Sequence, residues 1–121
     1  MSTALIIDDN RQTADALSQM LSVLGVEARV AYGSGPAMEI LGKLTPRLIL
    51  LDINMPGVDG LEVLAYLRRE PRLAPIPVVV ITSDDQPETR NRVLNGGATA
   101  ILIKPATLDA LEGVLKKAKV L

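Results

Sequence analysis

The sequence of 121 residues contains no cysteine and no histidine, and its aromatic residues are two tyrosines, Tyr32 and Tyr66. Without cysteine the chain can form neither a disulfide framework nor a cysteine-ligated metal site, which fits a reducing, cytoplasmic compartment. Because aromatic side chains are so few, binding that depends on stacking with bases or sugars is not expected.

The sequence also lacks a strong excess of charge and a long hydrophobic segment. Thirteen basic and fourteen acidic residues give a net charge of -1, and no block of basic residues is longer than a pair. We therefore expect no direct binding of nucleic acid. No segment approaches the roughly 18 apolar residues of a membrane helix, and the start, MSTALIIDDN, lacks the basic region of a signal peptide. Contact with a membrane is not expected either.

The length predicts a single domain, residues 1–121, which can fold without covalent cross-links. Five short aliphatic runs have the length and the β-branched content of strands. Apart from Arg29 in the second, they are continuously hydrophobic rather than alternating, and we therefore expect them to be covered on both faces. The predicted strands are Ala4–Ile7, Ala28–Ala31, Leu48–Leu51, Val78–Ile81 and Ala100–Ile103.

Segments of helical periodicity separate these strands. The first places Ala14, Leu17 and Leu21 on one stripe and is followed by Gly25, a typical helix stop. Five alternations of strand and helix predict an α/β fold with a parallel, doubly wound sheet, which binds ligands beyond the carboxyl ends of its strands. Start signals for three further helices are Ser34 with Pro36, Asp59 with Glu62, and Asp85 with Glu88.

Polar residues follow four of the five strands: Asp8 and Asp9, Asp52, Thr82 and Lys104. Taken singly, such residues are common in turns, but together they predict a site at one edge of the sheet. Three neighbouring carboxylates repel one another, and a divalent cation removes that conflict. With oxygen ligands alone, the site favours Mg²⁺. Lys104 can bind a phosphoryl oxygen, and the hydroxyl of Thr82 can donate a hydrogen bond to another.

These groups predict a phosphoryl-transfer site, in which positioning and charge neutralisation supply most of the catalysis. No serine, cysteine or histidine is placed to act as the nucleophile, but a carboxylate can attack phosphorus and form an acyl phosphate. Asp52 follows the central one of the charged strand ends. It is therefore the predicted nucleophile.

Four motifs in order, DD, DINMPGVDG, IPVVVITS and GATAILIKP, resemble the receiver domain of bacterial two-component response regulators, the CheY-like fold. The match runs from Thr3 to the last helix. The resemblance implies a flavodoxin-like sheet with strand order 2-1-3-4-5. It also implies a signalling module rather than an enzyme with other substrates, one whose phosphorylation and dephosphorylation switch the binding of a downstream protein target.

The resemblance assigns roles to individual residues. Asp52 resembles the phosphoacceptor, which receives the phosphoryl group from the histidine of a sensor histidine kinase or histidine phosphotransfer protein, or from a small donor such as acetyl phosphate. Asp9 resembles a direct Mg²⁺ ligand, Asp8 one that acts through water, and the backbone carbonyl of Asn54 a further ligand; Asp52 completes the metal set.

Thr82 resembles the switch hydroxyl of the family, and Lys104 its phosphate-binding lysine. The Lys104-Pro105 bond is cis in many relatives. The expected docking surface for the kinase is the first helix, with Asn10, Arg11 and Ala14.

The chain departs from the family pattern at several positions. Ile101 stands where an aromatic switch residue is common, and Ser83 where a smaller residue is typical. Asn54 and Asp84 occupy variable positions that tune the lifetime of the phosphoryl group.

Two other functions compete with this interpretation. A Mg²⁺-dependent phosphatase with an aspartyl nucleophile typically carries a second carboxylate two residues after it, where this chain has Asn54. A receiver-shaped scaffold that is never phosphorylated would explain Ile101, but all five active-site positions are intact.

Overall fold

The computed structural model describes residues 3–121, with the backbone alone described at Val58; Met1 and Ser2 of the predicted domain lie outside the described residues. All five predicted strands are confirmed, and the fourth is one residue longer because it includes Thr82. The elements in order are β1 (Ala4–Ile7), α1 (Arg11–Val23), β2 (Ala28–Ala31), α2 (Ser34–Leu41), β3 (Leu48–Leu51), β4 (Asn54–Met55), β5 (Val58–Asp59), α3 (Gly60–Arg69), β6 (Val78–Thr82), α4 (Pro87–Asn95), β7 (Ala100–Ile103) and α5 (Leu108–Lys117).

The main sheet is parallel and has the order β2-β1-β3-β6-β7. This is the predicted flavodoxin-like order 2-1-3-4-5, because β4 and β5 form a separate hairpin. Ile7 of β1 pairs with Leu51 of β3, and Thr82 of β6 pairs with Ile103 of β7. The residues that follow these pairs therefore leave the sheet at the same edge.

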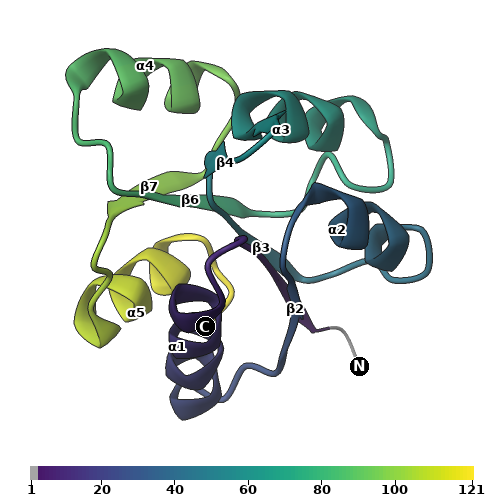
Figure 1. The fold of residues 1–121 in the computed structure, drawn as a ribbon. Helices are drawn as coiled ribbons and strands as arrows, with labels where there is room; N and C mark the ends of the chain where they lie inside the picture. The colour runs from purple at the N-terminus through teal and green to yellow at the C-terminus, as the bar shows by residue number, and fades with distance from the viewer. Residues whose placement is uncertain (1–2) are drawn as a thin grey trace.

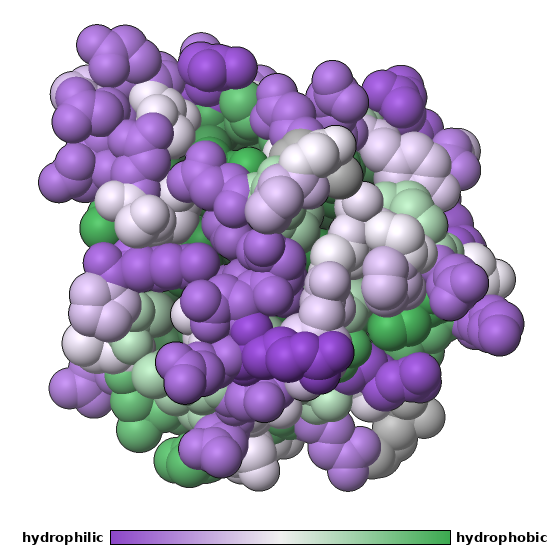
Figure 2. All heavy atoms as spheres, in the orientation of Figure 1, coloured by the Kyte–Doolittle hydropathy of each residue, from purple (hydrophilic) through white to green (hydrophobic). Residues whose placement is uncertain are grey.

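Helices cover both faces of the sheet, as Figure 1 shows: α1 and α5 lie on one side, and α2, α3 and α4 on the other. The three central strands are buried along their whole length, whereas β2 and β7 at the sheet edges are partly exposed. The core is aliphatic on both sides, with Leu17, Leu21 and Leu111 on one and Leu41, Leu64 and Leu67 on the other. In Figure 2, hydrophilic residues cover most of the face in view.

The segment after β3, for which the sequence predicts no strand, folds into the β4–β5 hairpin. Met55 pairs with Val58, and Pro56 and Gly57 form the turn between them. Gly57 has a φ of 73°, and proline followed by glycine with positive φ is typical of a type II turn. The hairpin ends at Asp59, whose carboxylate caps α3 by accepting a hydrogen bond from Leu61 N at 2.9 Å.

Two of the three predicted helix starts are correct, and the third is wrong. Helix α2 begins at Ser34 and α3 follows Asp59, as predicted. Helix α4 does not begin at Asp85: its N-cap is Gln86, and Pro87 is its first residue. The carboxylate that accepts hydrogen bonds at this helix start belongs to Asp84 instead.

Candidate functional site

The three predicted acidic residues come together at the carboxyl edge of the sheet. Asp8, Asp9 and Asp52 each offer a carboxylate oxygen, and these oxygens all lie within 4.8 Å of one another. We call these residues the acidic cluster. Asp8 and Asp52 are buried, with 1% and 5% of their surface exposed, whereas Asp9 is exposed. The cluster is thus accessible to solvent at Asp9.

Lys104 provides the positive charge of the site. Its Nζ lies 3.1 Å from Asp8 Oδ2 and 3.6 Å from Asp52 Oδ2. The backbone places it there, because Lys104 N donates to Thr82 O at 2.8 Å, which continues the β6–β7 pairing by one residue. The bond between Lys104 and Pro105 is cis, as the resemblance implied.

The two buried carboxylates are held in the same way by their own loops. Asp8 Oδ1 accepts a hydrogen bond from Asn10 N at 2.9 Å, and Asp52 Oδ1 accepts one from Asn54 N at 3.0 Å. In each case this bond fixes the rotation of the carboxylate and leaves the other oxygen beside Lys104. The arrangement fixes both carboxylates before any ligand binds.

Burial raises the pKa of Asp52, and the nearby Asp8 carboxylate raises it further; the Asn54 N–H and the Lys104 ammonium act in the opposite direction. The carboxylate form of Asp52 is thus kept in an environment that penalises its charge. A bound cation would relieve this penalty. The donor set contains carboxylate oxygens and neither histidine nor cysteine, so it fits a hard ion such as Mg²⁺.

Thr82 is fully buried beside this cluster, at the end of β6. Its Oγ1 accepts hydrogen bonds from Asn54 Nδ2 at 3.0 Å and from Asp84 N at 3.1 Å. The structure therefore brings together all of the predicted site residues. It also adds a contact that the sequence does not predict, the hydrogen bond from the side-chain amide of Asn54 to Thr82.

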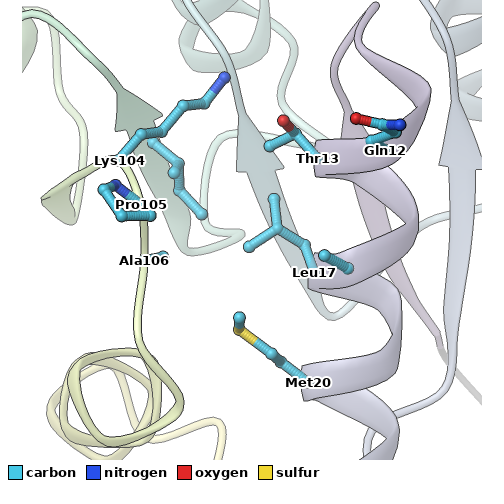
Figure 3. A pocket seen from close by; sticks show the side chains of 9 residues that line it. Gln12, Thr13, Leu17, Met20, Lys104, Pro105 and Ala106 are labelled. Atoms are coloured by element: carbon cyan, nitrogen blue, oxygen red, sulfur yellow. The ribbon is translucent and has the colours of Figure 1, made fainter.

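A pocket of about 470 Å³ lies between α1 and the loop after β7. Lys104, whose ammonium group reaches the acidic cluster, also lines this pocket. Met20 and Leu17 make its α1 side apolar. Figure 3 shows side chains of α1 facing those of the loop: Thr13, Leu17 and Met20 on one side, and Lys104, Pro105 and Ala106 on the other.

The expected docking surface on α1 needs one correction. Asn10 and Arg11 are exposed, but Ala14 is fully buried, because it belongs to the helix stripe that packs on the sheet. Arg11 stacks over Tyr32, with its guanidinium carbon 4.1 Å from the ring centroid. Tyr32 in turn donates a hydrogen bond to Asp15 at 2.7 Å.

Ile101 is partly buried and packs against a small apolar cluster of Ile53, Val80 and Val93. Val93 is a residue of α4, so Ile101 contributes to the contact between β7 and that helix. Ser83, the other departure from the family pattern, is exposed. Within residues 3–121, no helix has the length and apolar character needed to cross a membrane.

Comparison with known proteins places these features in a family. The model of the family described as "Response regulator receiver domain" matches residues 4–116 of this chain. The chain is 31% identical to the probable methanogenesis regulatory protein FilR2 of Methanothrix harundinacea, over 95% of this chain and 79% of FilR2. It is 33% identical to the DNA-binding dual master transcriptional regulator RpaA of Synechocystis sp., over 92% of this chain but only 46% of RpaA.

Among solved structures, the chain is similar to the signal receiver domain of the DNA binding response regulator protein merR from Colwellia psychrerythraea. The TM-score is 0.91 at 28% sequence identity, and the alignment covers 100% of both chains. The family match over residues 4–116 and the strand order of the main sheet both agree with the family that the motifs at the strand ends indicate. The chain belongs to the response regulator receiver domain family.

Proposed function

We propose that this chain is a phosphoacceptor receiver, in which Mg²⁺-dependent phosphoryl transfer to Asp52 switches the binding of a protein partner. The observation that carries the proposal is the position of Asp52. Its buried carboxylate lies close to the carboxylates of Asp8 and Asp9, and the ammonium group of Lys104 is 3.6 Å away. Three carboxylates that share one lysine leave an excess of negative charge, which a bound cation would neutralise.

In the proposed reaction, an oxygen of Asp52 attacks the phosphorus of a phosphohistidine. The new bond is an acyl phosphate, and the P–N bond breaks with its electron pair returning to the imidazole of the donor, which takes up a proton. Lys104 binds a phosphoryl oxygen, and the Thr82 hydroxyl donates to another after it turns toward Asp52. The Asn54 N–H holds the attacking carboxylate in a fixed rotation.

Asp8, Asp9, Asp52 and the backbone carbonyl of Asn54 would hold Mg²⁺. When bound, the ion neutralises the negative charge of the cluster and of the incoming phosphoryl group. The chemistry of the donor set supports this assignment, because hard oxygen ligands are what Mg²⁺ prefers.

The proposed phosphodonor is a sensor histidine kinase or a histidine phosphotransfer protein, which docks at the exposed start of α1 and beside the pocket. The phosphorylated form then binds a downstream protein in the cytoplasm. The chain itself contacts neither nucleic acid nor membrane and catalyses no reaction other than its own phosphorylation and dephosphorylation. The phosphatase alternative lacks support, because Asn54 cannot act as an acid or base and its amide already bonds Thr82.

The proposal is tested by incubating the protein with Mg²⁺ and acetyl phosphate and measuring intact mass. We expect one phosphoryl adduct on the wild type, no adduct on Asp52→Asn, and none when a chelator is added. Asp59→Asn is the matched control, because Asp59 lies near in sequence but caps α3 outside the cluster. An adduct on Asp52→Asn would overturn the assignment, and steady hydrolysis of many phosphate esters would favour the phosphatase.

A further inference from the structure

Exposed basic residues gather at the amino edge of the sheet, which is the edge opposite the acidic cluster. They come from the loops after α2 and α3 and from the segment after α5, and we call them the basic edge: Lys43, Arg47, Arg72 and Lys119. Arg47 directly precedes β3, whereas Asp52 directly follows it. The whole length of the central strand therefore separates the basic edge from the proposed nucleophile.

Hydrogen bonds hold the segments of the basic edge together. Arg47 Nη2 donates to Val120 O at 2.6 Å, which joins the α2–β3 loop to the segment that carries Lys119. The guanidinium group of Arg72 donates to the end of α2 and to the loop that follows it, where Lys43 lies. Its acceptors are Leu41 O, Leu44 O and Thr45 Oγ1. Three distant parts of the chain thus place their positive charges around one loop.

The positive charge of the basic edge is not neutralised by carboxylates. In the part of the chain that the structure describes, the ion pairs involve Lys104 and Lys116 but no residue of the basic edge. The acceptors of Arg47 and Arg72 are uncharged oxygens, which fix each guanidinium group without cancelling its charge. A guanidinium group has five N–H donors, and one that is already fixed loses less conformational entropy when it binds an anion.

Lys119 has a backbone conformation that favours glycine. Its φ is 62°, in the left-handed region, and it follows Ala118, the C-cap of α5. Lys119 N donates to Lys116 O and Val120 N donates to Leu115 O, which are the hydrogen bonds of a Schellman motif. A lysine at the left-handed position of this motif costs stability that a glycine would not. Such strain is typical of functional positions, so it indicates a role for the lysine side chain.

We propose that the basic edge is a binding surface for an acidic segment of a partner protein, rich in aspartate and glutamate, and that this partner binds while the acidic cluster stays free. Arginine suits carboxylates because two of its N–H groups can bind both carboxylate oxygens at once. The inference does not require that Asp52 be phosphorylated.

The charges around the basic edge favour a short acidic segment over a nucleic acid or a membrane. Exposed glutamates, Glu39 and Glu70, precede Lys43 and Arg72 in the same segments and limit the positive area. The net charge of the chain is -1, so a polyanion that extends beyond this area would meet a surface with no excess of positive charge.

The proposal is tested with a fluorescein-labelled oligoglutamate peptide, titrated with the protein at low salt and followed by fluorescence anisotropy. Lys43→Gln combined with Lys119→Gln removes two charges and keeps the hydrogen bonds of Arg47 and Arg72. We expect this double variant to bind the peptide about 3- to 10-fold more weakly than the wild type. Added salt should weaken binding by the wild type.

Arg90→Gln combined with Arg92→Gln is the matched control, because it removes two exposed positive charges from α4. This control should bind the peptide like the wild type. Equal weakening in both double variants would mean that net charge alone sets the affinity, which would overturn the proposal. Absence of peptide binding by the wild type would overturn it as well.

Lys119→Gly tests the strain argument separately. Glycine should relieve the left-handed conformation, so we expect Tm to rise by a few degrees while the affinity for the peptide falls. Scanning calorimetry and the anisotropy titration measure the two effects. An unchanged or lower Tm would show that the lysine carries no strain, and an unchanged affinity would remove Lys119 from the binding surface.

Amide NMR signals locate the bound peptide. Signals of residues 42–47 and 117–120 should shift when the peptide is added, and those of residues 8–10 and 52–54 should not. Shifts centred at the acidic cluster would contradict the proposal. The class of partner is wrong if duplex DNA or phosphatidylserine vesicles bind more tightly than the peptide and depend equally on Lys43 and Lys119. It is also wrong if the wild type self-associates at low salt and the Lys43→Gln, Lys119→Gln variant does not, since a second copy would then occupy the basic edge.

Discussion

Lys104 Nζ lies 3.6 Å from Asp52 Oδ2, although the two residues follow different strands, β7 and β3, with β6 between them in the sheet. The parallel register brings them together, because Asp52 follows β3 and Lys104 follows β7 at the same sheet edge. Lys104 also forms an ion pair with Asp8, so a single ammonium group interacts with two buried carboxylates. One positive charge cannot neutralise three carboxylates, and the acidic cluster is therefore ready to bind a cation.

The first prediction concerns this cation. Mg²⁺ at ten times its dissociation constant should stabilise the fold by about 1.4 kcal/mol and raise Tm by a few degrees. Asp9→Asn should abolish most of the shift while leaving the metal-free Tm nearly unchanged, because Asp9 is exposed. Scanning calorimetry with Mg²⁺ or chelator measures both. Asp85→Asn, an exposed aspartate outside the cluster, should respond like the wild type, and an equal response of Asp9→Asn would contradict the metal assignment.

Gly60 should tolerate no side chain. A Cβ built there would lie 2.2 Å from Ile53 Cα and 3.0 Å from Asp52 O, so the backbone that carries the nucleophile would have to move. We expect Gly60→Ala to lower the free energy of unfolding by about 1–3 kcal/mol and to slow phosphorylation by acetyl phosphate. Urea denaturation and the mass assay measure the two effects.

Gly113→Ala is the matched control for that substitution. It lies within α5, and nothing stands within 4 Å of the added carbon. Because alanine favours the helix, this variant should be more stable by about 0.5–1 kcal/mol and should be phosphorylated normally. Equal destabilisation by both variants would show that close packing against Ile53 is not the cause.

The carboxylate of Asp84, which accepts hydrogen bonds at the start of α4, should make the stability of the fold depend on pH. Hydrogen bonds from Thr89 and Gln86 lower the pKa of Asp84 below its usual value of 3.8. A carboxyl whose pKa is lower in the folded state stabilises the fold above the unfolded-state pKa, and this contribution is lost as the pH falls through the folded-state pKa. Asp84→Ala should therefore have a lower Tm than the wild type at pH 7.

This difference in Tm should shrink below about pH 3.8 and vanish at more acidic pH. Thermal melts of both proteins across the pH range, followed by circular dichroism, provide the measurement. A difference that is constant with pH would mean that the Asp84 charge does not stabilise the helix start.

The pocket along α1 should matter for a protein phosphodonor but not for a small one. Ala16 lines this pocket and is exposed, so Ala16→Glu would place a charge in an apolar surface without disturbing the core. We expect slower transfer from any histidine phosphotransfer protein that phosphorylates the wild type, with an unchanged rate from acetyl phosphate. Gln19→Glu, exposed on the same helix and outside the pocket lining, is the control. If Ala16→Glu and the wild type accept the phosphoryl group from the phosphotransfer protein at equal rates, that protein does not dock at the pocket.

The main architecture follows from the sequence because its central strands are continuously hydrophobic and polar residues stand at their carboxyl ends. Runs such as Leu48–Leu51 have the length and the apolar character of strands at the centre of a covered sheet. Once the strands are aligned, the convergence of Asp8, Asp52 and Lys104 follows from parallel geometry alone.

The parts that escaped prediction depend on contacts between segments. The β4–β5 hairpin has strands of two residues each, too short for any periodic pattern. The start of α4 was misplaced because the carboxylate that serves it, Asp84, lies two residues before the N-cap Gln86. The bond from Asn54 to Thr82 joins the start of β4 to the end of β6, which only the folded sheet brings together.

The central claim is that Asp52 carries the phosphoryl group, and locating the modified residue tests it most directly. After reaction with acetyl phosphate and Mg²⁺, the acyl phosphate is reduced with borohydride and the digested protein is sequenced by mass spectrometry. Because the chain contains no histidine or cysteine, phosphohistidine and phosphocysteine cannot contribute to the signal. We predict that aspartate is converted to homoserine at position 52 alone. Conversion at position 8 or 9 with position 52 unmodified would contradict the account.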